Sequence, residues 1–92
     1  MKVVILGKMD DDNMFNLAEE KIRKEGNIPI NPMRVLYALP EDITLSDFIA
    51  VLIELVRISD AVLLCPGWMN DLACTIAKTN AERLDKAVIK CQ

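Results

Sequence analysis

One segment constrains the fold of this chain more than any other: an apolar run that stops at a tight turn. Residues 60–65 read Asp-Ala-Val-Leu-Leu-Cys, and Pro66-Gly67-Trp68 breaks the run. A continuous apolar stretch of this length, ended by turn residues, is typical of a strand buried on both faces. Residues 3–6, ended by Gly7, repeat the pattern near the start. Two such strands predict an α/β domain with a parallel sheet.

Three stretches carry the start signals of helices. Residues 10–13, Asp-Asp-Asp-Asn, supply N-cap chemistry for a helix of about 12 residues that Gly26 stops, and we interpret the acidic triplet as capping rather than as a metal site. Residues 44–47 match a capping box, which predicts a helix over 45–58. Asn70 or Asp71 caps a third helix, which runs to about Leu84.

Two short strands and a loop complete the pattern. Residues 27–30 contain Pro29, which cannot donate to a ladder, so they predict an edge strand. Residues 87–91 predict a last strand, and residues 33–43 predict a loop, with one helical turn left open. Loops of this length are often lids or binding segments. We therefore expect one small three-layer flavodoxin/Rossmann-like domain over residues 1–92, with about three helices and a four-stranded parallel sheet in the order 2-1-3-4.

Composition excludes several kinds of function. The net charge of −3 and the pI near 4.8 argue against nucleic acid as a partner. Histidine is absent, so any catalysis would rest on carboxylates. Cys65, Cys74 and Cys91 follow no metal-ligand spacing, so we expect reduced thiols, no metal and no cofactor. No segment approaches the ~18 apolar residues of a membrane span, and we expect a cytoplasmic protein.

The predicted helix over 45–58 is apolar nearly all round. A two-layer arrangement cannot bury such a helix by itself. We expect one face to pack on the sheet and another on a second copy of the chain, in a homodimer or a larger homo-oligomer.

The candidate ligand site follows from the parallel sheet. Ligands of open parallel sheets sit beyond the carboxyl ends of the strands. The residues at and just after these ends are therefore the ligand-binding candidates: Gly7, Lys8, Met9, Asn31, Pro66, Gly67, Trp68 and Asp71. Trp68 either stacks on a flat ring of a ligand or covers the edge of the core.

Residues 59–68, Ser-Asp-Ala-Val-Leu-Leu-Cys-Pro-Gly-Trp, also carry a resemblance. Together with Gly7 and Met9 at the first strand, Gly26 and Asn31-Pro32, they resemble a family of small phage and bacterial proteins described as nucleoside 2-deoxyribosyltransferase-like. The resemblance spans nearly the whole chain. In active relatives it implies a glutamate that attacks the anomeric carbon of the sugar and an aspartate that helps to place the nucleoside.

Both of those carboxylates are missing from this chain. The glutamate position is Ala77 and the aspartate position is Leu52. Retaining glycosyl transfer needs a nucleophile and an acid, so the resemblance implies no catalytic residue here. Asp71 replaces a serine that faces a phosphate in relatives, which disfavours a nucleoside monophosphate.

Three hypotheses follow. The leading one is a degenerate member of this family that binds a nucleoside or another small ring without glycosyl transfer by the usual mechanism. The second is an active enzyme on N-glycosidic bonds, a deoxyribosyltransferase or nucleoside hydrolase, that recruits Asp47, Glu54 or Asp71 from a neighbouring subunit; within one subunit, neither Glu54 nor Glu82 can replace the missing groups. The third is a structural or interaction protein that acts through the apolar helix over 45–58.

Overall fold

The structure is a computed structural model that describes residues 1–91. Its four strands are all parallel and lie in the order β2-β1-β3-β4, which confirms the predicted sheet. In chain order the elements are β1 (Lys2–Leu6), α1 (Asp12–Lys24), β2 (Ile28–Ile30), α2 (Pro32–Ala38), α3 (Leu45–Ile58), β3 (Ala61–Leu64), the 3-10 turn η1 (Trp68–Asn70), α4 (Leu72–Arg83) and β4 (Ala87–Lys90).

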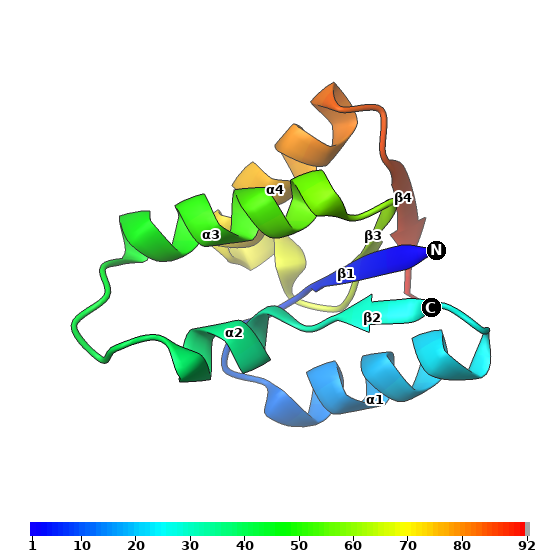
Figure 1. The fold of residues 1–92 in the computed structure, drawn as a ribbon, viewed down its shortest axis with the longest axis horizontal. Coiled ribbons are helices and arrows are strands. Elements are labelled where there is room, and N and C mark those ends of the chain that lie inside the picture. The colour runs from blue at the N-terminus through cyan, green and yellow to red at the C-terminus, as the bar shows by residue number, and fades with distance from the viewer. Residues whose placement is uncertain (92) are drawn as a thin grey trace.

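Helices cover the sheet on both sides, which gives three layers. Figure 1 shows α1 on one side and α3 with α4 on the other. Side chains alternate along each strand, so neighbouring residues of β1 and β3 enter different cores. The α1-side core contains Val3, Ile5, Phe15, Ala18, Ile22, Ala61 and Leu63, and the other core contains Val4, Leu6, Phe48, Leu52, Val56, Val62, Leu64, Ala77 and Ala81.

The helix starts confirm the capping predictions. At α1, a carboxylate oxygen of Asp11 accepts a hydrogen bond from the Met14 amide at 3.0 Å. Thr44 and Asp47 form both hydrogen bonds of a capping box at α3. Asp71, one of the two residues expected to cap α4, accepts from the Cys74 amide at 3.1 Å. Each cap satisfies backbone N–H groups that a helix start leaves free.

The segment after β2 corrects the loop prediction for residues 33–43, and residues 1–91 form four α-helices where about three were expected. Residues 32–38 form α2, a helix of 7 residues. Asn31 is its N-cap, since its side-chain oxygen accepts from the Met33 amide at 2.9 Å, and Pro32 occupies the first helical position. Proline suits that position because its missing N–H would be unpaired there anyway. The sequence of α2 has no clear hydrophobic period, although its cap at Asn31 and Pro32 specifies a helix start.

Strand β2 lies at one edge of the sheet, as Pro29 predicts. It is 3 residues long and pairs with β1 alone among the strands, with Ile30 opposite Val4. In the part of the chain that the structure describes, no helix has the length and apolar character needed to cross a membrane.

Candidate functional site

The residues predicted to bind a ligand are distributed over separate hollows at the carboxyl end of the sheet. Met9 and Asp71 line one hollow, Pro66, Gly67 and Trp68 line a second, and Asn31 lines a third. The candidate residues at the strand ends therefore line three hollows.

The first hollow lies where the strand order changes direction, between β1 and β3, and we call it the switch-point cleft. Its volume is about 210 Å³. The β1–α1 loop, the start of α4 and the α2–α3 segment form its walls. Its lining residues are Met9, Leu36, Ile43, Thr44, Leu45, Phe48, Asp71 and Ala73.

Two polar side chains lie in this mainly apolar lining. Thr44 accepts the Asp47 amide through Oγ1 at 3.1 Å, which leaves its O–H free to donate. Asp71 uses one carboxylate oxygen as the cap of α4. Burial, followed by the charge of Asp71, raises the pKa of the Cys74 thiol to about 12, so Cys74 is a neutral thiol near the cleft. Its Sγ donates to the Gly7 carbonyl at 3.0 Å.

Gly7 is buried and has a packing role. A Cβ at this position would lie 2.2 Å from the terminal carbon of Met14 and 3.2 Å from the Cβ of Cys65. The missing side chain leaves room for the end of the Met14 side chain. Lys8 is exposed, and its Nζ lies 3.9 Å from Asp10.

The second hollow, of about 200 Å³, holds Pro66, Gly67 and Trp68 beside the end of β4. Gly67 has a φ of +89°, and a Cβ there would meet the Cβ of Lys8 at 2.9 Å, so the β1 and β3 loops are in close contact. Trp68 is half-buried against the core on the α4 side. Lys78 places its Nζ 5.3 Å from the centre of the Trp68 ring, a cation–π distance. Trp68 therefore covers the core edge and lies outside the switch-point cleft.

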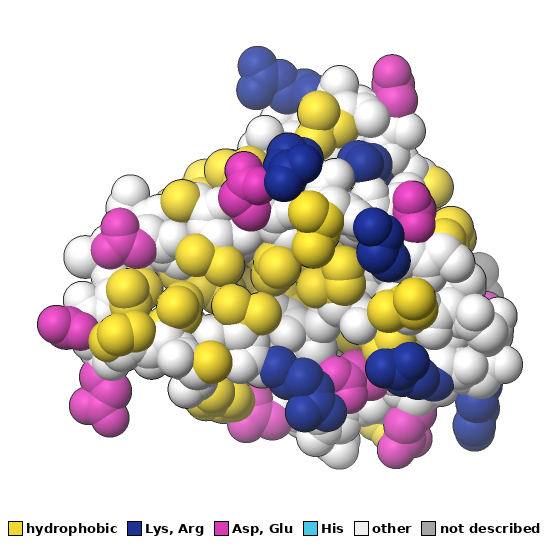
Figure 2. Space-filling view, in the orientation of Figure 1, with side chains coloured by type: hydrophobic (Ala, Val, Ile, Leu, Met, Phe, Trp, Pro, Cys, Tyr) yellow, Lys and Arg dark blue, Asp and Glu magenta, His cyan; other side chains and the backbone are white. Residues whose placement is uncertain are grey.

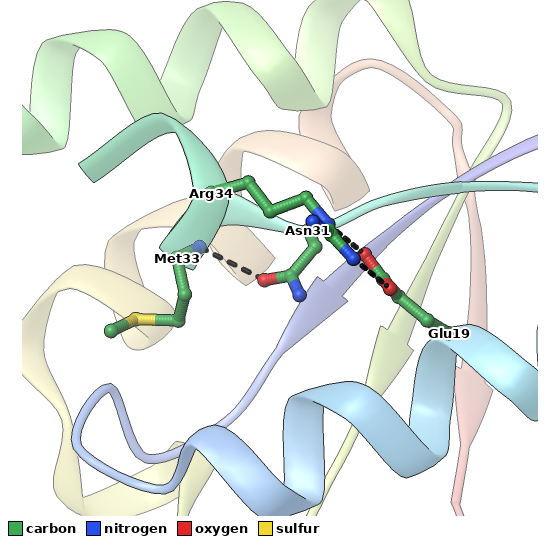
Figure 3. A network of polar contacts seen from close by, with 4 residues as sticks. All are labelled: Glu19, Asn31, Met33 and Arg34. Carbon is green, nitrogen blue, oxygen red and sulfur yellow. Dashed lines mark hydrogen bonds and ion pairs between the residues drawn. The ribbon is translucent and has the colours of Figure 1, made fainter. Parts of the chain in front are cut away.

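The third hollow, of about 180 Å³, lies between α1 and α2. Figure 3 shows Arg34 reaching from α2 to Glu19 on α1, with Asn31 beside them. Arg34 binds Glu19 through two N–H groups, at 2.6 and 2.8 Å, which holds the pKa of the Glu19 carboxyl below its ordinary value. Asn31 is buried and caps α2, so its oxygen is already engaged. The Arg34–Glu19 ion pair beside this hollow therefore links α2 to α1.

The positions where the resemblance implies carboxylates are core positions. Leu52 on α3 and Ala77 on α4 both have 0% exposure and belong to the core between these helices and the sheet. A carboxylate at either position would be buried without a partner. Asp71 is the one acidic side chain among the residues that line the switch-point cleft.

Comparison with protein families gives one result. The model of the domain of unknown function DUF4406 matches residues 2–90. The chain belongs to the DUF4406 family. No curated protein and no solved structure matches it. The description of DUF4406 names no activity.

Several lining residues of the switch-point cleft were not among the predicted ligand-binding residues. Leu36, Ile43, Thr44 and Phe48 come from α2, the following loop and α3. The prediction that residues 33–43 form a lid or binding segment was a signal for them. It did not indicate which side chains of the segment face the strand ends. Within residues 1–91 of this DUF4406 domain, no group of three His, Cys, Asp or Glu side chains is placed to hold a metal ion.

Proposed function

We propose that this DUF4406 protein binds a small, uncharged ring compound of nucleoside type in the switch-point cleft, without breaking its glycosidic bond. The observation that carries the proposal is the lining of the cleft. Its walls are apolar, and its two polar groups, the Thr44 hydroxyl and the Asp71 carboxylate, begin two different helices. Small-molecule sites typically combine apolar walls with a few fixed polar groups.

Size and charge narrow the class of ligand. A volume of about 210 Å³ is below the ~300 Å³ at which sites for drug-sized ligands begin, so the cleft suits a single base or a nucleoside that protrudes from it. Asp71 accepts hydrogen bonds, so it favours sugar hydroxyls or ring N–H groups. The same negative charge repels a phosphate, so nucleoside monophosphates should bind more weakly.

The proposal excludes glycosyl transfer by the usual route because that route needs two carboxylates. Asp71 supplies one at most, and it already caps α4. Leu52 and Ala77 add none. Catalysis would require an acidic residue from a second subunit, which is the competing hypothesis in the test.

The test combines thermal shifts with titration calorimetry, using deoxynucleosides, free bases and nucleoside monophosphates. A ligand at 100 times its dissociation constant stabilises the fold by about 2.7 kcal/mol, which a thermal shift detects. Asp71→Asn is the informative variant because the amide oxygen can still cap α4 while the charge is lost. We expect about tenfold weaker nucleoside binding and little change in the melting temperature without ligand.

Trp68→Phe is the matched control, since Trp68 lines the neighbouring hollow. If Trp68→Phe weakens nucleoside binding and Asp71→Asn does not, the ligand binds outside the switch-point cleft. Chromatography of the same mixtures detects base release or exchange. Robust turnover would overturn binding without catalysis, and turnover that survives Glu54→Ala and Glu82→Ala would also remove these two residues as its source.

A further inference from the structure

The surface on the α3 side of β2 is unusually apolar, and we call it the apolar band. Figure 2 shows hydrophobic side chains gathered along the seam between α3 and the β2–α2 segment. Ile28 of β2 is 53% exposed and Ile58 of α3 is 42% exposed. The band consists of Ile28, Ile30, Val51, Leu55 and Ile58, the other three being partly buried.

The handedness of α3 explains which of its residues lie in the band. Phe48, Leu52 and Val56 face the sheet. In the view of Figure 1, α3 runs from left to right with β2 below it and α4 above it. In a right-handed helix so placed, the residue before each core position, such as Val51 or Leu55, points towards β2. Ile58 lies on the same side, at i+7 from Val51.

The fold leaves this band uncovered. α3 packs on β1, α2 and α4, and α4 packs on β1, β3, β4 and η1. α1 packs on β2 from the other side of the sheet, and on the α3 side Ile28 stays exposed while Ile30 is partly buried. The prediction that α3 is apolar all round is thereby refined, because its outer side carries the ion pair Glu54–Arg57 at 2.7 Å.

The two ends of the band carry opposite charge. Glu41, Asp42 and Asp47 form its acidic end, beside the start of α3, and residues 35–56 contain no Lys or Arg. Lys2, Arg57 and Lys86 form its basic end; Lys86 donates to the Arg57 carbonyl at 3.1 Å. Glu54 and Asp60 offset part of this positive charge. Figure 2 shows acidic side chains without basic ones around the left end, whereas basic side chains, with some acidic ones among them, flank the right part of the band.

We infer that the apolar band is the contact surface for a second copy of this chain, in a two-fold dimer with the two bands antiparallel. A two-fold axis through the middle of the band places the apolar residues of both copies together. It also places the acidic end of each copy on the basic end of the other. A parallel arrangement would set acidic end against acidic end. Exposed ion pairs contribute little energy, but complementary charge selects the orientation.

The first experiment measures the dimer by sedimentation velocity over a concentration series. Ile28 lies opposite Lys2, at the basic end of the band. Ile28→Glu therefore buries a negative charge against the acidic end of the other copy, twice per dimer, and we expect the dissociation constant to rise by about 100-fold. Leu17→Glu is the matched control, because Leu17 is 57% exposed on α1, on the other side of the sheet. It should leave the dissociation constant within about threefold of the wild-type value. Circular dichroism checks that both variants fold, and Ile28→Ser replaces Ile28→Glu if it does not.

The second experiment tests orientation by charge reversal. One variant carries Glu41→Lys and Asp42→Lys, and the other carries Lys2→Glu and Lys86→Glu. Each alone places like charges together at both ends of an antiparallel dimer, so each should dimerise at least tenfold more weakly. A mixture of the two restores opposite charges at both ends, so a heterodimer should form with near wild-type affinity.

Three results would overturn the inference. A wild-type chain that stays monomeric at about 100 μM has no such dimer. A dimer that Ile28→Glu or Ile28→Ser leaves intact uses another surface. A mixture of the two charge variants that forms no heterodimer rules out the antiparallel orientation.

Discussion

Restoring a carboxylate at the position where the resemblance implies one tests the register and the burial of α4 together. The substitution is Ala77→Glu. Ala77 has 0% exposure and lies among the core residues under α4. We expect the introduced carboxyl to be buried without a partner, to destabilise the fold and to confer no glycosyl transfer.

The magnitude follows from burial and protonation. Burial raises the pKa of an unpaired carboxyl by up to 3–5 units, so at pH 7 the folded chain keeps it protonated. Taking up that proton costs 1.36 kcal/mol for each unit between the ordinary glutamate pKa of about 4.3 and pH 7, or about 3.7 kcal/mol. Overpacking adds about 1–3 kcal/mol. The total, about 5–7 kcal/mol, equals much of the stability of a typical domain, ~5–15 kcal/mol.

The pH dependence separates charge from size. Because the pKa is raised in the folded state, that state binds more protons than the unfolded chain, and stability falls as the pH rises above about 4.3. Ala77→Gln adds similar bulk without a titrating group. The difference between the two variants should therefore shrink from about 3.7 kcal/mol at pH 7 to about 1 kcal/mol at pH 5.

Urea unfolding at both pH values, followed by circular dichroism and by the fluorescence of Trp68, measures this difference. Thr79→Glu is the control on the exposed side of α4 and should change stability by less than about 0.5 kcal/mol. If Ala77→Glu is unfolded at pH 7, recovery of structure at pH 5 supplies the same information. Stability within about 1 kcal/mol of wild type at pH 7 would refute the burial of position 77.

Two further predictions concern titratable groups. Arg34→Ala should raise the pKa of the Glu19 carboxyl, which an NMR titration measures; an unchanged pKa would contradict the Arg34–Glu19 ion pair. The ion pair stabilises the wild type at pH values above the unfolded-state pKa of Glu19. That stabilisation is lost as the pH falls through the lower folded-state pKa. Burial raises the pKa of Cys65 and of Cys74 to about 12, so a thiol reagent at pH 7.5 should modify the partly exposed Cys91 first and the other two thiols only on unfolding. Modification of all three thiols of the folded chain at one rate would contradict the burial of Cys65 and Cys74.

The sequence predicted most of the fold because its signals are local. The apolar runs at β1 and β3 and the caps at Asp11, Thr44 and Asp71 each specify an element without help from the rest of the chain. The start of α2 was also encoded, by Asn31-Pro32 as cap and first helical residue. No hydrophobic period accompanies this cap, because α2 has 7 residues and buries only Pro32 and Met33 at its start.

The candidate site was less predictable because it depends on which side chains fill the space between loops. The strand order places Met9 and Asp71 at one cleft. Nothing local indicated that η1 would direct Trp68 to a separate hollow, or that Met14 would occupy the space beside Gly7. These outcomes depend on packing between distant segments, which sequence spacing does not report.

Strand β2 carries a consequence for how the protein avoids uncontrolled assembly. A sheet edge beside an apolar surface is a template on which further strands can add without limit. Here the edge is 3 residues long and its middle residue is Pro29, which has no N–H to offer a new strand. Pro29 thus hinders the addition of further strands at the sheet edge beside the apolar band. The two-fold contact proposed for the apolar band would be of a different kind, because such a contact closes on itself and stops at two copies.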